Sequence, residues 1–374
     1  MKIKQMCMLV LLWLGVIPAM QAQTFDKLWK EVEQAEKKSL PQTVIKLTGE
    51  IYQKGEMEKN SPQLLKAYMW RMKYRDMLTP DSLYTGLQEL KQWAKQADKP
   101  MDRAILHSLI AGMYADYAAN NQWQLRQRTE IAGEAPSADM REWTANMFVE
   151  KVRTNVKEAM ADSVLLLNTS SRTYIPFVEL GETSEYYHHD MYHLLASRSI
   201  EALQRIQGLD RTTPIEAYSE ETSSEKESLV KQDIERIYDQ MLTSYKAKGD
   251  KEGCLLTSLN YLNWKHGTSK SFREPFRVKK GGTYMTFDPY ETGLDALKTE
   301  YKSLDLCAEV YLAQANNAIG KEQETVALQL CDEAIRLYPG YRRINALKNL
   351  REDILAPSLN VTAAATAFPG EEIE

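Results

Sequence analysis

The chain has 374 residues with a formal net charge of −5; 43% of its residues are hydrophobic and 26% are charged. These proportions are typical of a globular protein and exclude wholesale disorder, and the acidic balance argues against a nucleic-acid partner. Only 17 glycines and 13 prolines are present. An all-β chain of this length needs more turn residues, so we expect a predominantly helical protein.

Residues 1–22 predict a secretory signal peptide. Lys2 and Lys4 precede an apolar run that reaches Met20, and Ala22 offers a small residue at a cleavage site. This order of basic, apolar and small residues is typical of export signals. No later stretch supplies the roughly 20 apolar residues that a transmembrane helix needs. We therefore expect an exported protein without a transmembrane helix.

Residues 23–218 predict a first helical block. Apolar residues at helical spacing favour helices over 25–37, from Pro41 onward and from a cap at Asn60 to Met77. Further helices are expected after the break at 79–81 and, most clearly, along a stripe with four-residue spacing: Met101, Ile105, Leu109, Met113 and Tyr117, flanked by Leu106, Ile110 and Tyr114. A stripe this wide is expected to be buried on two sides, as in a helical solenoid.

The end of this block is less regular. Ser137 is expected to cap a helix that runs to about Met160, and the next helix is expected over 190–206. The segment 168–185 between them predicts a long irregular connection. Residues 219–227 then form a polar, acidic stretch without an apolar residue, which indicates a linker between two helical blocks.

Residues 219–356 predict a second helical block, in which 270–288 reads as a basic loop. Within this block, 308–340 fits a degenerate tetratricopeptide repeat, a unit of about 34 residues in which small residues let two helices approach and a proline ends the second helix. The pattern assigns the repeat positions as follows: the aromatic position to Tyr311, the small packing positions to Ala327, Cys331 and Ala334, and the terminating proline to Pro339. A last helix is expected over 341–355.

The character of the chain changes after Pro357. Leu359, Val361 and Ala363 alternate with polar residues, which is the two-residue period of a β-strand. Two short strands cannot bury a core by themselves. We therefore expect residues 357–374 to begin a truncated β-sandwich. The predicted fold class is all-α, a tetratricopeptide-like helical-hairpin solenoid with a short C-terminal β-strand stub.

Several segments resemble the N-terminal helical region of bacterial alpha-2-macroglobulin family proteins of the Bacteroidetes type. The matching segments are FDKLWKEVEQAEKKSLPQTVIKLTGEIYQKG from residue 25, YADYAANNQWQLRQRTE (114–130), REWTANMFVEKV (141–152), DMYHLLASRSIEAL (190–203) and LCDEAIRLYPG (330–340). The final residues resemble the entry into the first macroglobulin-like β-sandwich. Together these segments are spread over nearly all of the mature chain.

The resemblance implies a secreted protein of the periplasm or cell envelope of a diderm bacterium. Members of the family are large protease traps that carry a bait segment and, in many cases, a reactive Cys–Gln thioester. Gly253 and Cys254 match only the first two residues of the thioester motif, so that role does not transfer. The resemblance implies a non-catalytic helical scaffold or interaction module without a cofactor. Its expected partners are downstream macroglobulin-like domains or an envelope protein, and proteases through the full-length protein.

An alternative interpretation is a self-contained periplasmic or surface binding protein for a peptide or a glycan. Helical solenoids present concave surfaces, and aromatic residues on such a surface could hold either ligand. Tyr186, Tyr187 and Tyr338 are the candidates. Core packing is the competing explanation for the aromatic residues, including the tryptophans, among them Trp123.

His189 and His193 form the weak candidate for a metal site. On one helix they would lie four residues apart on one face, as the zinc ligands of H-E-x-x-H metalloproteases do, with Asp190 in the place of the glutamate base. No third ligand is identifiable from the sequence. The competing explanation is the start of a helix with exposed imidazoles, and we predict no catalytic, cofactor or metal residues.

Three cysteines remain after removal of the signal peptide: Cys254, Cys307 and Cys331. An odd number argues against a disulfide framework, although the exported compartment would permit a Cys307–Cys331 bridge. The alternative is that each cysteine is a small buried apolar residue.

Overall fold

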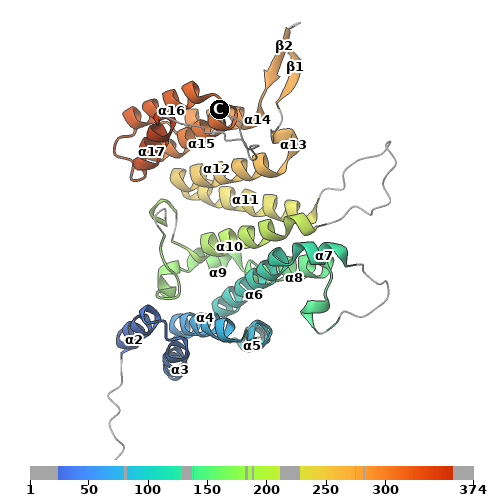
Figure 1. The fold of residues 1–374 in the computed structure, drawn as a ribbon, viewed down its shortest axis with the longest axis vertical. Helices are drawn as coiled ribbons and strands as arrows, with labels where there is room; N and C mark the ends of the chain where they lie inside the picture. The colour runs from blue at the N-terminus through green and yellow to red at the C-terminus, as the bar shows by residue number, and fades with distance from the viewer. Residues whose placement is uncertain are drawn as a thin grey trace, which may run out of the picture. The chain divides into compact units, whose positions relative to one another are not determined.

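A computed structural model describes residues 24–79, 82–128, 137, 139–181, 184–187, 189–210, 228–273, 275–280 and 283–356. Within these residues the chain is helical except for one two-stranded antiparallel hairpin, so the predicted all-α fold class is confirmed (Figure 1). The predicted signal peptide, the linker over 219–227 and the strand stub over 357–374 lie outside the described residues.

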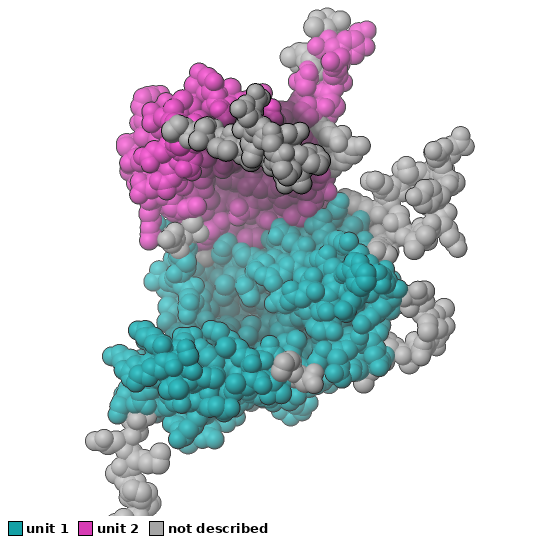
Figure 2. Space-filling view, viewed as in Figure 1, with its two compact units in different colours: residues 1–185, 189–234 teal, residues 186–188, 235–374 magenta. Residues whose placement is uncertain are grey.

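The chain divides into two compact units (Figure 2). Unit 1 comprises residues 1–185 and 189–234, and unit 2 comprises residues 186–188 and 235–374. The division falls inside helix α11 (Leu229–Lys248), whereas the sequence placed the boundary between its two helical blocks at 218/219. A single helix thus contributes residues to both units.

Unit 1 is built mainly from α-helices. Its helices are α2 (Phe25–Lys37), α3 (Pro41–Met57), α4 (Ser61–Leu78), α5 (Ser82–Gln96), α6 (Pro100–Asn120), α7 (Gln122–Gln127), α8 (Ala145–Ala159), α9 (Ser163–Asn168) and α10 (Met191–Ile206). Short 3₁₀ turns lie at Met140–Glu142, Ser171–Tyr174, Ser184–Tyr186 and Gln207–Leu209. Helix α3 packs on α2 and α4, and α6 packs on α5, α8 and α10.

Local capping explains where several of these helices begin. The Thr24 side chain accepts a hydrogen bond from the backbone N–H of Lys27, so α2 begins at Phe25. The Asn60 side chain accepts from the backbone N–H of Gln63 at 3.3 Å and opens α4. Such caps satisfy backbone donors that have no partner inside the helix. The sequence carried these signals, and α2 has its predicted bounds.

Helix α6 contributes a large part of the unit 1 core. Ile105, Leu106, Ile110 and Tyr114 are all at most 2% exposed. The predicted four-residue stripe leaves this buried face after Ile105, because a spacing of four exceeds the 3.6 residues of a helical turn. From there, burial follows Leu106, Ile110 and Tyr114, while the later residues of the predicted stripe are only partly buried.

The predicted helix from Ser137 to Met160 is wrong in its first part. Met140–Glu142 forms a 3₁₀ turn, Trp143 and Thr144 are extended, and α8 begins only at Ala145. The Trp143 indole donates to the Ser137 backbone oxygen at 2.7 Å, which folds the segment back on itself. Ser137 is therefore an acceptor for a buried tryptophan and does not cap α8.

Unit 2 continues the helical pattern after α11. Its elements are α12 (Lys251–Thr268), α13 (Lys270–Arg273), β1 (Phe276–Lys280), β2 (Thr283–Phe287), α14 (Pro289–Glu300), a 3₁₀ turn (Asp305–Cys307), α15 (Ala308–Gly320), α16 (Glu324–Leu337) and α17 (Ile344–Leu355). Helix α14 packs on α12 and α15, and α16 packs on α15 and α17. The predicted basic loop over 270–288 is wrong, because this segment contains α13 and the β1–β2 hairpin.

Candidate binding surfaces

The structure does not bring His189 and His193 together as metal ligands. Helix α10 begins at Met191, so His189 precedes it and the two imidazoles do not share a helix face. Asp190 is the N-cap, and its carboxylate accepts from the backbone N–H of His193 at 2.8 Å. Its predicted place as a catalytic base is therefore wrong. No group of three or more potential metal ligands occurs in the part of the chain that the structure describes.

The three cysteines that the structure describes are free thiols in unit 2. Cys254, Cys307 and Cys331 are all buried, so the alternative with a Cys307–Cys331 bridge is wrong. Burial raises the pKa of each thiol. A thiol with a raised pKa carries little thiolate and is a poor nucleophile. These cysteines therefore fill space in the core.

The residues at the predicted repeat positions lie on the α15–α16 hairpin. Ala327, Cys331 and Ala334 have no exposed surface, and Tyr311 is 4% exposed. Helix α16 ends at Leu337, two residues before Pro339. The Tyr311 ring meets the Tyr338 ring edge-on, with 5.9 Å between the ring centroids. The two helices approach along small side chains; membership of the tetratricopeptide class stays a prediction.

An open pocket of about 400 Å³ adjoins this hairpin in unit 2. Its lining residues are Lys298, Thr299, Lys302, Tyr311, Leu337 and Tyr338. Helix α14 and the turn after it supply the two lysines, while α15 and the end of α16 supply the aromatic and apolar residues. We call this set the Lys–Tyr pocket.

Internal contacts hold the walls of the Lys–Tyr pocket. The Lys298 Nζ lies 5.1 Å from the centroid of the Tyr311 ring and donates to Gln314 Oε1 at 3.1 Å. The Tyr338 hydroxyl donates to the Lys302 backbone oxygen at 3.1 Å. Burial, followed by the neighbouring Glu333, raises the pKa of Tyr311 to about 12. Tyr311 therefore stays a neutral phenol at physiological pH.

The two lysines of this pocket differ in their availability. Lys298 is 3.3 Å from Asp295 Oδ1, so part of its charge is already compensated. The side chain of Lys302 is exposed and forms no ion pair with another residue that the structure describes. An exposed ammonium beside two tyrosine rings and Leu337 can hold a carboxylate that is attached to an apolar group.

Unit 1 holds a second pocket of about 310 Å³ between α5, α6 and the 139–143 segment. The Arg141 guanidinium lies 4.6 Å from the Tyr84 ring centroid and pairs with the Asp139 carboxylate at 2.7 Å. Hydrogen bonds from Arg141 lower the pKa of Asp139.

Trp143 and Lys91 also line this pocket of unit 1. Burial, with smaller effects from Lys95 and Lys151, lowers the pKa of Lys91.

The other aromatic candidates contact neighbouring rings. The Tyr186 ring lies 6.3 Å from Tyr341, and the Tyr187 ring lies 6.3 Å from Tyr245, so both pack within unit 2. Burial raises the pKa of the Tyr187 phenol. Core packing holds for Trp29, Trp143 and Trp264 but is wrong for Trp123, which is 72% exposed.

No protein-family model matches the chain, and no curated protein matches it. The resemblance to alpha-2-macroglobulins therefore stays a prediction from the sequence segments alone. Across the described helices, none has both the length and the apolar character that a membrane span requires.

Proposed function

We propose that this chain is a non-catalytic interaction module, the N-terminal helical region of an exported alpha-2-macroglobulin-like protein. It acts in the periplasm or cell envelope, where it positions downstream macroglobulin-like domains or contacts an envelope protein. The segment resemblance and the all-α fold support this proposal. Neither a bait segment nor a thioester is part of the proposed mechanism.

The Lys–Tyr pocket is the observation that carries the proposal. It combines an exposed ammonium, Lys302, with the apolar and aromatic surface of Tyr311, Leu337 and Tyr338. A glutamate or aspartate next to an apolar residue in a partner polypeptide complements both parts. The site binds through charge and burial and needs no covalent step, as expected for a scaffold.

The packing of the pocket explains how it would hold a partner in a fixed place. Tyr311 and Tyr338 are each at most 5% exposed, and the Tyr338 hydroxyl is bonded to the backbone after α14. The aromatic walls are therefore preorganised, and their side chains lose little additional entropy when a ligand binds. Such a site suits positioning of a partner domain.

A protease assay tests the role as a module rather than a complete trap. The mature chain (residues 23–374) is mixed at equimolar ratio with trypsin or elastase, and digestion of casein is followed. We expect the digestion rate to stay unchanged, because the proposed mechanism assigns trapping to other domains. A full-length bacterial alpha-2-macroglobulin serves as the positive control. Strong inhibition by the chain alone at this ratio would contradict the proposal.

The unit 1 pocket favours the second candidate function, a self-contained binding protein for a peptide or glycan. Tyr84, Tyr114 and Trp143 give it aromatic walls, which is the surface on which sugar rings stack. Titration with cello- and malto-oligosaccharides, followed by tryptophan fluorescence, separates the two functions. A saturable change in tryptophan fluorescence that is weaker in the Tyr84→Ala variant would favour the second candidate function. No change in fluorescence would contradict binding of a glycan.

A further inference from the structure

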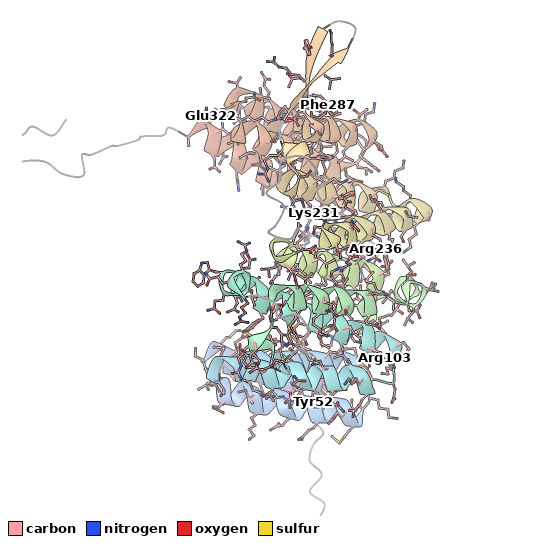
Figure 3. All side chains as sticks on the ribbon, turned by 90° about the vertical axis from the view of Figure 1, so that its right-hand side faces the viewer. Tyr52, Arg103, Lys231, Arg236, Phe287 and Glu322 are labelled. Carbon is pink, nitrogen blue, oxygen red and sulfur yellow. The ribbon has the colours of Figure 1, made fainter. Side chains whose placement is uncertain are left out.

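The β1–β2 hairpin is a two-stranded sheet at one end of unit 2. Phe276 pairs with Phe287 and Lys280 with Thr283 in an antiparallel register. Figures 1 and 3 show the hairpin extending away from the helices of unit 2, and Figure 3 labels Phe287 near its base. No third strand joins the sheet in the described part of the chain. Both outer edges therefore present backbone donors and acceptors without a ladder partner there.

The two faces of the hairpin differ in chemistry. Phe276, Val278 and Phe287 share one face, and each is 39–46% exposed. The Phe276 and Phe287 rings lie 5.1 Å apart. Arg277 and Lys279 are exposed on the opposite face, where the Lys279 Nζ lies 5.7 Å from the Tyr284 ring centroid. One face thus carries the exposed apolar residues and the other carries Arg277 and Lys279, while Lys280 pairs with Thr283 in register with the apolar residues; all three cations belong to β1.

An isolated hairpin is marginally stable in water, and three or more strands with a buried face are normally needed. This hairpin leaves large apolar side chains exposed, and both of its edges lack a ladder partner. Addition of one strand would satisfy an edge and place the side chains of the added strand beside Phe276 and Val278. The geometry therefore favours extension of the sheet by another polypeptide segment.

The charge of the hairpin indicates which kind of partner segment would bind to it. Residues 276–287 contain three basic residues and no acidic residue, although the whole chain carries a net charge of −5. A second copy of this hairpin would place like charges opposite one another, which is unfavourable. A lipid bilayer cannot satisfy the open backbone edges in its apolar core. A strand that alternates acidic and apolar residues matches the basic residues of β1, the exposed apolar side chains and the open backbone edge.

We propose that β1 binds an extended acidic segment of a partner protein as a third strand. Acidic side chains of that segment would face Arg277 and Lys279, and its apolar side chains would extend the face of Phe276 and Val278. This inference goes beyond the proposed function and does not rest on it, because it uses neither the Lys–Tyr pocket nor the family resemblance.

The test uses the mature chain and a fluorescein-labelled decapeptide that alternates glutamate with valine or threonine. We expect saturable binding by fluorescence anisotropy, and we expect the double variant Arg277→Glu/Lys279→Glu to weaken it at least tenfold. The variant Lys37→Glu/Lys38→Glu changes the net charge equally at two exposed positions at the end of α2 and is the matched control. It should bind as the unaltered chain does.

Two further arms test the sheet itself. A decapeptide N-methylated at every residue has no backbone N–H donor on either edge and should lose binding if a ladder forms. Equal binding of the methylated peptide, or equal weakening by the α2 variant, would overturn the proposal. So would an absence of peptide binding together with hairpin-dependent binding to phosphatidylglycerol vesicles, since that result would assign the hairpin to a membrane surface.

Discussion

Replacing Asp102 with alanine is expected to lower the free energy of unfolding of unit 1 by about 3 kcal/mol. Asp102 is 8% exposed on α6. Its Oδ2 accepts from the Ser61 hydroxyl at 2.6 Å, and its Oδ1 accepts from the Tyr174 hydroxyl at 2.7 Å. The Asp102 carboxylate thus joins the start of α4, the start of α6 and the 3₁₀ turn at Ser171–Tyr174.

The size of this effect follows from the groups left behind. Ser61 and Tyr174 are at most 7% exposed, so neither hydroxyl reaches solvent freely once the carboxylate is gone. An unsatisfied buried hydroxyl costs about 1–3 kcal/mol. Asp102→Asn keeps one acceptor oxygen and should lose less than Asp102→Ala.

Urea unfolding measures the change in the free energy of unfolding. Hydrogen exchange of the backbone amides of α4 and α6 then shows whether the change lies in unit 1. Asp98→Ala is the matched control, because Asp98 is exposed just before the same helix. It should change the free energy of unfolding by less than about 0.5 kcal/mol. If Asp102→Ala behaved like this control, the carboxylate would have no role in joining the three elements.

The second large effect is expected at the α15–α16 contact. Ala327→Leu should destabilise unit 2 by about 2 kcal/mol, because three extra carbon atoms enter a closed helix–helix contact. Ala327 has no exposed surface, and neither do Cys331 and Ala334 along the same face of α16. Thermal unfolding and hydrogen exchange of α15 and α16 measure the loss.

Val326→Leu is the control for this substitution. Val326 is the preceding residue of α16 but is 45% exposed, so the added carbon meets solvent. Its stability should stay within about 0.5 kcal/mol of the unaltered chain. Equal stability of Ala327→Leu and Val326→Leu would mean that the small residues do not set the approach of the two helices.

The helices with local signals were predictable from the sequence. Thr24 and Asn60 cap α2 and α4 through their own side chains, and such signals act over three residues. The start of α8 was not predictable, because it depends on a bond from Trp143 to Ser137 within a folded-back segment. Asp190 is a typical N-cap residue, and this local signal could have predicted that His189 lies before α10, contrary to the zinc-site hypothesis.

The two binding surfaces also differ in how far the sequence predicts them. The hairpin had a signal, since Gly281-Gly282 lies between two segments with alternating residues, and that pattern is typical of a β-turn. Of the Lys–Tyr pocket, only Tyr338 was predicted as a candidate for a binding surface. Lys302 and Tyr338 are 36 residues apart and meet only because α14, α15 and α16 pack together. Periodicity along one helix carries no information about such a meeting.

Titration of the Lys–Tyr pocket tests the proposed role most directly. The probe is acetyl-Leu-Glu-Leu-amide, which is too short to extend a sheet, and binding is followed by NMR shifts of the mature chain. We predict shifts at Tyr311 and Tyr338, and affinity about fivefold lower for the double variant Lys298→Glu/Lys302→Glu or for the glutamine analogue of the peptide. Equal binding of both peptides to both proteins, or shifts elsewhere only, would contradict the account.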